Sequence, residues 1–326
     1  MATPLPSTTR RVVARCGRFA ATDHLLTYVI KKVHAVTHTA LMRRLTTAAA
    51  VSASNASHVY THGHAQAVVA HHAKRTAKAF APACLELLRP GDSILDVGCG
   101  PGSITRGFRD AVGSSGRVVG LDAEPKVVME AQALCGDAAE IAVGDVYKLS
   151  AFADGSMDVV HAHQVLQHLQ NPVAALCEMR RVAKRYVVCR DVVYDSWTWN
   201  SPSRGLEDWR RVYRAVARRN QGDPDAGMNL LSYFSRAGMS SVELKPTVVS
   251  YAGEAETRAL AGTWAQRITE TRLAEHAIAQ GESTKEKNAA MAAAWIEWGA
   301  RLFSFAWGLT LVAQRANRTH APCILT

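Results

Sequence analysis

The chain has 326 residues, which is enough for one large domain or two small ones. Its 48% of hydrophobic residues and mean hydropathy of -0.06 are typical of a globular protein. The most apolar stretch near the end, residues 302–313, is too short to cross a bilayer, so we expect no membrane span.

The net charge of +10 is confined to the N-terminal quarter of the chain. Residues 1–85 contain eleven Lys or Arg and one acid, Asp23, whereas the rest of the chain has 27 residues of each sign. The remainder therefore has no excess positive charge with which to hold a phosphate backbone. This balance argues against nucleic acid as a partner.

The first segment, residues 1–57, is basic and rich in Arg, Ser, Thr and Ala. Such a composition is typical of a disordered extension or of an organelle transit peptide, so we place it outside the fold. The seven cysteines form no Cys-x-x-Cys pair, which favours a reducing compartment. We expect a cytoplasmic location, with import into mitochondria as the alternative.

Residues 58–90 precede the first predicted strand, and a helix is predicted over residues 65–88. This segment contains four histidines, at positions 62, 64, 71 and 72. Imidazole is a common metal ligand, but no acid or cysteine lies nearby at ligand spacing, and His71 and His72 point to different helix faces. We therefore expect no metal site.

The next segment is an apolar strand followed by a glycine-rich turn, Ile94 to Gly102, and a helix from Ser103 to Val112. Ligands of doubly wound folds bind where such a turn meets a helix N-terminus. A dinucleotide fingerprint would place its third glycine at position 103, but here it is Gly102. Asp96 would also repel a pyrophosphate, whereas it would attract an amino group.

Three more strands are predicted, over Arg117–Asp122, Ile141–Val146 and Asp158–Ala162. The first two carry acids at their ends, Asp122 and Asp145, and His163 follows the third. Parallel strands bring such ends together at one edge of a sheet.

Asp96 to Gly102 resembles the first motif of the class I S-adenosylmethionine-dependent methyltransferases, acidic-x-Gly-x-Gly-x-Gly, at every fixed position. The resemblance implies S-adenosylmethionine as cofactor, with the loop along its amino-acid portion and Asp96 near its amino group. It further implies that Asp122 holds the ribose hydroxyls and that Asp145 accepts from the adenine amino group. The cofactor-binding residues expected on this basis are Asp96, Gly98, Cys99, Gly100, Gly102, Asp122, Ala123, Asp145, Val146, His163 and Gln164.

Val165 to Leu169 resembles a segment of the subgroup that includes the ubiquinone and menaquinone C-methyltransferases. Methyl transfer to a phenol or an acidic carbon gains from a base, and histidine has a suitable pKa. We expect His163 or His168 to contact cofactor or substrate, although His168 also fits an amphipathic, purely structural pattern. Tyr60, in the predicted lid, is a candidate neighbour of the positive sulfonium.

The methyltransferase domain is expected to span residues 58–252, with a lid at 58–90 and an insertion at 191–226. Two short strands, Val242–Leu244 and Thr247–Tyr251, are predicted to pair as a hairpin, and residues 253–326 to form a helical extension. The family resemblance implies a Rossmann-like, doubly wound α/β fold. Its sheet would have seven strands, parallel except for an antiparallel last strand.

The predicted function is transfer of a methyl group to an O, N or C nucleophile of a small molecule. The alternatives are an NAD(P)-dependent oxidoreductase, disfavoured by the glycine spacing, and a methyltransferase-like binding or assembly protein without catalysis. Residues 191–326 contain no motif that identifies the acceptor, and the sequence leaves the oligomeric state open.

Overall fold

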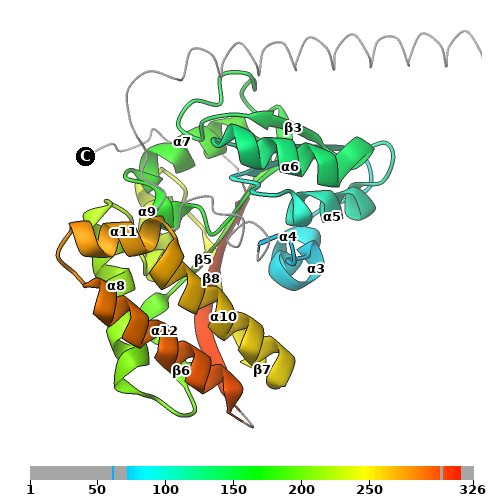
Figure 1. The fold of residues 1–326 in the computed structure, drawn as a ribbon. Coiled ribbons are helices and arrows are strands. Elements are labelled where there is room, and N and C mark those ends of the chain that lie inside the picture. The colour runs from blue at the N-terminus through cyan, green and yellow to red at the C-terminus, as the bar shows by residue number, and fades with distance from the viewer. Residues whose placement is uncertain (1–60, 62–71, 302–303, 317–326) are drawn as a thin grey trace, which may run out of the picture.

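The computed structural model describes residue 61 and residues 72–301 and 304–316, which fold around one mainly parallel sheet (Figure 1). Its strands are β1 (Ser93–Val97), β2 (Arg117–Asp122), β3 (Glu140–Val143), β4 (Met157–His163), β5 (Ala183–Val192), β6 (Thr198–Trp199), β7 (Glu243–Ala252) and β8 (Phe305–Ala316). Their order is β3-β2-β1-β4-β5-β8-β6, and β7 also pairs with β8. Strands β1 to β5 are parallel, and β8 is antiparallel to each of its neighbours. The predicted doubly wound α/β class is confirmed.

The helices fall into two groups (Figure 1). One group surrounds the parallel strands and the other lies beside the long strands β5 and β8. The first group consists of α3 (Ala77–Phe80), α4 (Pro82–Leu85), α5 (Ser103–Val112), α6 (Pro125–Cys135), α7 (Pro172–Val182) and α9 (Ala226–Arg236). The second group consists of α8 (Arg204–Arg219), α10 (Glu254–Glu270), α11 (Arg272–Ala279) and α12 (Lys285–Ala300).

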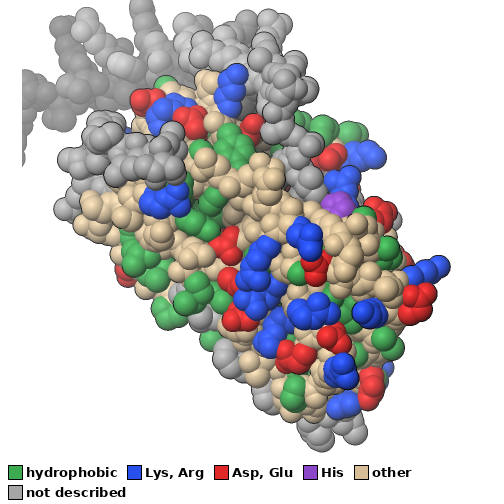
Figure 2. Space-filling view, turned by 90° about the vertical axis from the view of Figure 1, so that its left-hand side faces the viewer, with side chains coloured by type: hydrophobic (Ala, Val, Ile, Leu, Met, Phe, Trp, Pro, Cys, Tyr) green, Lys and Arg blue, Asp and Glu red, His purple; other side chains and the backbone are tan. Residues whose placement is uncertain are grey.

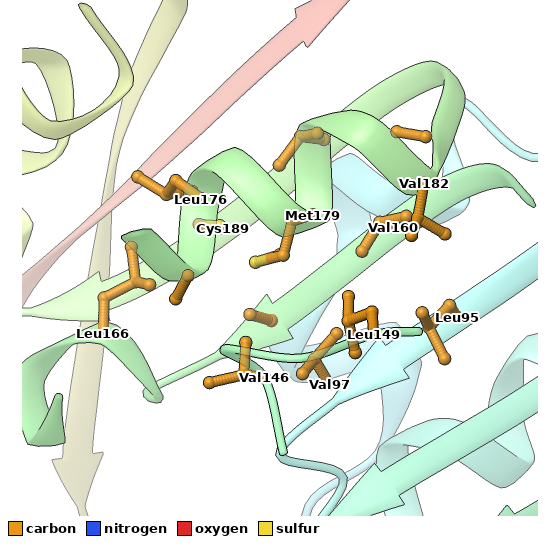
Figure 3. Packing of buried hydrophobic residues seen from close by; sticks show 14 of the residues in the cluster. Leu95, Val97, Val146, Leu149, Val160, Leu166, Leu176, Met179, Val182 and Cys189 are labelled. Carbon is orange, nitrogen blue, oxygen red and sulfur yellow. The ribbon is translucent and has the colours of Figure 1, made fainter. Parts of the chain in front are cut away.

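The sheet is buried on both faces, as parallel sheets require. Ile94 belongs to the cluster on one face that includes Phe108 of α5. Its neighbour Leu95 belongs to the cluster on the other face, to which α7 contributes Leu176 and Met179 (Figure 3). Because successive side chains of a strand point to opposite faces, both residues of β1 are fully buried. Because the sheet is packed on both faces, the ends of its strands, which form the candidate site, are held in position.

The predicted helix start at Ser103 is confirmed. Helix α5 begins at Ser103 directly after the glycine turn. Helix α7 begins at Pro172, where the Asn171 side chain accepts a hydrogen bond from the Ala174 amide at 3.0 Å.

The hairpin predicted within residues 242–251 is wrong. Residues Glu243–Ala252 form one continuous strand, β7, which pairs along its length with β8. Pro246 is tolerated because β7 pairs only with β8 among the described residues, so its other edge requires no N–H donor. The antiparallel strand expected at the end of the sheet is β8.

The predicted boundary at residue 253 also differs from the structure. The apolar stretch 302–313 contributes to β8, which returns to the sheet between β5 and β7. Helices α10, α11 and α12 are therefore inserted between the last two strands of the sheet. The count of seven strands is not confirmed, because the described residues form an 8-stranded sheet that includes the two-residue β6.

The single helix predicted over residues 65–88 is replaced, where the chain is described, by the short helices α3 and α4. Thr76 caps α3 by accepting from the Ala79 amide, and Pro82 occupies the first turn of α4. A proline inside a longer helix would remove a backbone hydrogen bond, which explains the break. Residues 1–60 and 62–71, which include the predicted extension and the first part of the predicted lid, lie outside the described residues.

No helix in the described ranges has the length and apolar character needed to span a membrane. The same ranges contain no group of three or more His, Cys, Asp or Glu side chains placed to hold a metal ion.

Candidate active site

The glycine turn joins β1 to α5 and has left-handed backbone at Gly100 (φ 54°) and Gly102 (φ 83°). A Cβ atom at Gly102 would lie 2.7 Å from the Cys135 sulfur, so this glycine lets α6 pack closely. A Cβ atom at Gly100 would meet no atom within 4 Å. The fold therefore requires Gly102, whereas Gly100 borders open space that suits a ligand.

Asp122 lies beside this open space, at the end of β2. Its carboxylate accepts hydrogen bonds from the Gly100 amide at 2.9 Å and from the Glu124 amide at 3.1 Å. The side chain is only half-buried, and the following Ala123 is exposed. A carboxylate is an acceptor of hydroxyl donors, which fits the ribose role that the family resemblance implies.

Asp145 follows β3, the neighbour of β2. The Gly144 amide donates to the Asp122 carbonyl at 2.9 Å, which keeps the ends of the two strands together. Asp145 accepts from the Tyr147 amide at 2.9 Å and is half-buried, while Val146 points into the core. The structure thus brings the Gly100 turn, Asp122 and Asp145 to one edge of the sheet.

Asp96 occupies a different position, beneath the turn, with 2% of its surface exposed. One carboxylate oxygen lies 2.8 Å from His161 Nδ1, and the other accepts from the Thr105 hydroxyl at 2.5 Å. Cys99 is also buried, packing with Val128 of α6. These contacts give both residues a structural role, and a direct contact of Asp96 with a cofactor amino group stays a prediction.

His163 ends β4 and is 8% exposed. Neither ring nitrogen has a hydrogen-bond partner among the described residues, and the ring packs edge-on against Phe80 at 5.7 Å between centroids. Burial, followed by the charges of Arg75 and Arg190, holds the pKa of His163 well below its usual value. The imidazole is therefore neutral, with a free lone pair available to a ligand.

Gln164 connects His163 to the next turn in a left-handed conformation, with φ 55°. Such a conformation is costly for a residue with a side chain and often marks a functional site. Its amide donates to the Arg190 carbonyl at 2.7 Å, and its side-chain oxygen accepts from Arg75 at 3.0 Å. These hydrogen bonds fix the backbone and side chain of Gln164, the residue that follows His163.

The structure gives no support for a catalytic role of the other two predicted catalytic residues, His168 and Tyr60. His168 ends a short 3-10 turn, Leu166–His168, and is half-buried beside the core residue Leu169. Tyr60 lies outside the described residues.

Three residues near His163 were missed by the sequence analysis: Arg75, Phe80 and Arg190. The guanidinium groups of Arg75 and Arg190 each lie 5.6 Å from the centre of the Phe80 ring. Arg190 follows the apolar run 186–189 near the end of β5, so the rule that strand ends carry site residues could have indicated it. Arg75 and Phe80 precede the sheet and carry no such signal.

Comparison with known proteins gives a family match over the parallel strands. Residues 95–189 match a family model described as a methyltransferase domain. An uncharacterized methyltransferase of Schizosaccharomyces pombe is 37% identical over 144 residues, which are 40% of this chain and 51% of that protein. A ubiquinone/menaquinone biosynthesis C-methyltransferase of Burkholderia mallei is 34% identical over 100 residues, 30% of this chain and 41% of that protein.

Among solved structures, a Haemonchus contortus phosphoethanolamine N-methyltransferase in complex with S-adenosylhomocysteine is similar, with 14% identity and a TM-score of 0.45. The match covers 73% of this chain and 52% of that one. The chain spans about half the length of the first curated relatives that it matches.

Proposed function

We propose that this chain, whose residues 95–189 are a class I methyltransferase domain with S-adenosylmethionine as cofactor, transfers a methyl group to a small-molecule acceptor. The observation that carries the proposal is the open space at Gly100, bordered by the half-buried carboxylate of Asp122 at the end of the neighbouring strand. This arrangement can hold a polar cofactor against main chain and carboxylate together.

Separate residues of the chain would bind the cofactor and contact the acceptor. Asp122 and Asp145 would hold the ribose and adenine ends of the cofactor, and the turn at Gly100 would lie along its amino-acid portion. When bound, the cofactor supplies a methyl group on a positive sulfonium. His163 would accept a hydrogen bond from the acceptor or the cofactor, because its neutral ring has no hydrogen-bond partner among the described residues.

The arginines of α8 bear on the class of acceptor. Arg214 pairs with Asp225 at 2.8 Å, Arg218 pairs with the same acid at 2.9 Å, and Arg219 pairs with Glu282 at 2.6 Å. On the face shown in Figure 2, basic side chains lie among acidic ones. Arginines neutralised in this way offer little to a nucleic-acid backbone, which favours a small acceptor.

Replacing Asp122 by alanine tests the cofactor assignment. We expect Asp122→Ala to weaken S-adenosylmethionine binding about tenfold or more, because the hydroxyl donors of the ribose lose their acceptor. Isothermal titration calorimetry measures the affinity. Asp110→Ala, at an exposed position of α5, is the control and should bind normally. Wild-type protein that binds NADH instead, or Asp122→Ala protein that binds S-adenosylmethionine as tightly as wild type, would contradict the proposal.

The glycine turn allows a matched pair of variants. Gly100→Ala should fold with a loss of about 1 kcal/mol from its left-handed backbone, yet bind the cofactor poorly, because the new methyl group enters the open space. Gly102→Ala should instead lose more stability, because its methyl group would collide with Cys135 and Ala131. Chemical denaturation and calorimetry together separate the two effects. Equal cofactor affinity in wild type and Gly100→Ala would show that the open space is not used.

Catalysis distinguishes an enzyme from a methyltransferase-like binding protein. We expect release of S-adenosylhomocysteine when the protein is incubated with S-adenosylmethionine and a panel of phenols, amines and carbon acids. Cofactor binding without turnover of any acceptor class would favour the binding protein.

A further inference from the structure

Two arginines, of which Arg190 lies near His163, are buried without an acidic partner among the described residues. Arg190 of β5 and Arg267 of α10 are 5% and 4% exposed. No carboxylate of the described residues forms an ion pair with either guanidinium group, in contrast to the paired arginines of α8. An uncompensated buried charge costs several kcal/mol, so folded proteins rarely keep one without a use for it.

The contacts that these arginines do make are neutral and long. Arg190 donates to the Phe80 carbonyl at 3.3 Å and to the Thr247 hydroxyl at 3.4 Å. Arg267 lies 3.5 Å from a ring nitrogen of His72 and stacks on Trp264 at 4.8 Å, while its Nε has no hydrogen-bond partner. Both groups therefore keep donor capacity and full positive charge.

The two arginines act on one region. Burial raises the pKa of the Tyr251 hydroxyl, while the charges of Arg75, Arg267 and Arg190 each oppose that rise, so the fields of all three arginines reach this phenol. Arg190 shares the Phe80 ring with Arg75. The same ring packs against His163.

The region is also linked to the glycine turn. The Ser103 hydroxyl, at the start of α5, donates to the His72 carbonyl at 3.0 Å, and the ring of His72 lies beside Arg267. Arg267 of α10 is thus connected through His72 to the start of α5, and Arg190 is connected through the Phe80 ring to His163.

The chain has little negative charge to offer these arginines. Asp191 is adjacent to Arg190 in sequence, but neighbouring side chains of a strand point to opposite faces. Burial raises the pKa of Asp191 to about 8, so it is largely protonated at neutral pH. Asp23 is the single acidic side chain in all the residues outside the described part.

We propose that Arg190 and Arg267 bind an oxyanion of the methyl acceptor, so that the acceptor is a small organic acid carrying a carboxylate or a phosphate. This inference rests on the proposed function, because it takes the region beside His163 as the acceptor site. The guanidinium fork matches both oxyanions in geometry and charge. Phe80, Tyr251 and Trp264 supply aromatic surfaces for the rest of the molecule.

The test uses benzoate, phenyl phosphate and the neutral benzamide as probes of the full-length protein with S-adenosylhomocysteine bound. We expect benzoate or phenyl phosphate to bind at least about tenfold more tightly than benzamide in calorimetry, a difference that needs no variant. A preference for one anion identifies the acid group. Equal affinity for all three probes, or no binding of either anion, would overturn the inference.

Methionine variants add a readout that a structural arginine would not give. Without anion, Arg190→Met and Arg267→Met should melt no lower than wild type, because each removes an uncompensated buried charge. Either anion should raise the melting temperature of wild type but not of the variants. Arg211→Met, at an exposed position of α8, is the control and should respond like wild type. A large drop in melting temperature in both methionine variants, with no response of wild type to anions, would assign the arginines to structure.

The cofactor separates this inference from the proposed function. Both methionine variants should bind S-adenosylmethionine as wild type does. Wild-type protein that fails to bind S-adenosylmethionine contradicts the proposed function, whereas normal cofactor binding without any anion preference contradicts only the present inference.

Discussion

Replacing Asp96 by alanine is expected to destabilise the domain by several kcal/mol, more than any other change near the glycine turn. The carboxylate is buried and bonded to two buried partners, His161 (1% exposed) and Thr105 (0% exposed). Alanine would leave both partners without their hydrogen bond, and each unsatisfied buried group costs about 1–3 kcal/mol. Chemical denaturation monitored by circular dichroism measures the loss.

Asp96→Asn provides the matched comparison. The amide keeps the size of the side chain and one oxygen acceptor, so it should lose less stability than alanine. It is also the proper variant for cofactor binding, because a weak affinity of Asp96→Ala would reflect partial unfolding. If Asp96→Ala unfolded at the same denaturant concentration as Asp110→Ala, the buried bonds to His161 and Thr105 would not stabilise the fold.

Much of the cofactor half could be predicted from the sequence because its signals are local. Buried parallel strands appear as short apolar runs, and β1, β2 and β4 were found to within two residues at each end. The glycine spacing and the acids at the strand ends follow directly from those strands. The position of Asp122 beside Gly100 was therefore within reach of sequence reasoning.

The acceptor half could not be predicted, because its structure depends on pairing between distant segments. Strand β8 pairs with β5 and with β7, which lie far apart in sequence from it and from each other. Pro246 lies in the gap between the two predicted strands, and the edge strand β7 tolerates a proline there. Because β8 was not predicted, the helices after Gly253 were predicted to form a C-terminal extension and not an insertion between two strands.

The arginines were missed for the same reason. In the sequence, Arg190 is marked only by its place near a strand end and Arg267 by nothing. The significance of both lies in burial without an acidic partner among the described residues. Arg267 is buried only in the folded chain, where His72 and Trp264 lie beside it, and Arg190 only where Phe80 and Thr247 lie beside β5.

The aromatic core of the inserted helices should be the second most sensitive part of the molecule. Trp209 of α8 is fully buried, and its ring lies 4.5 Å from that of Trp264 and 4.8 Å from that of Trp295. Trp209→Ala should cost about 3–5 kcal/mol, because it leaves a large cavity and removes both ring contacts. Trp209→Phe, which keeps an aromatic ring, should cost less. Denaturation followed by tryptophan fluorescence measures both.

Anion binding by Trp209→Ala tests whether the aromatic core of the inserted helices supports the proposed acceptor site. The Trp264 ring contacts Trp209, and the guanidinium group of Arg267 stacks on the same Trp264 ring. Loosening the core should therefore displace that arginine. The glycine turn and Asp122 belong to the parallel strands, which pack through separate clusters. At a temperature where the variant stays folded, we therefore expect weaker binding of benzoate or phenyl phosphate, with S-adenosylmethionine affinity unchanged. Parallel loss of both affinities in the folded variant would instead mean that the two halves are structurally coupled, because the inserted helices then support the sheet as well as the acceptor side.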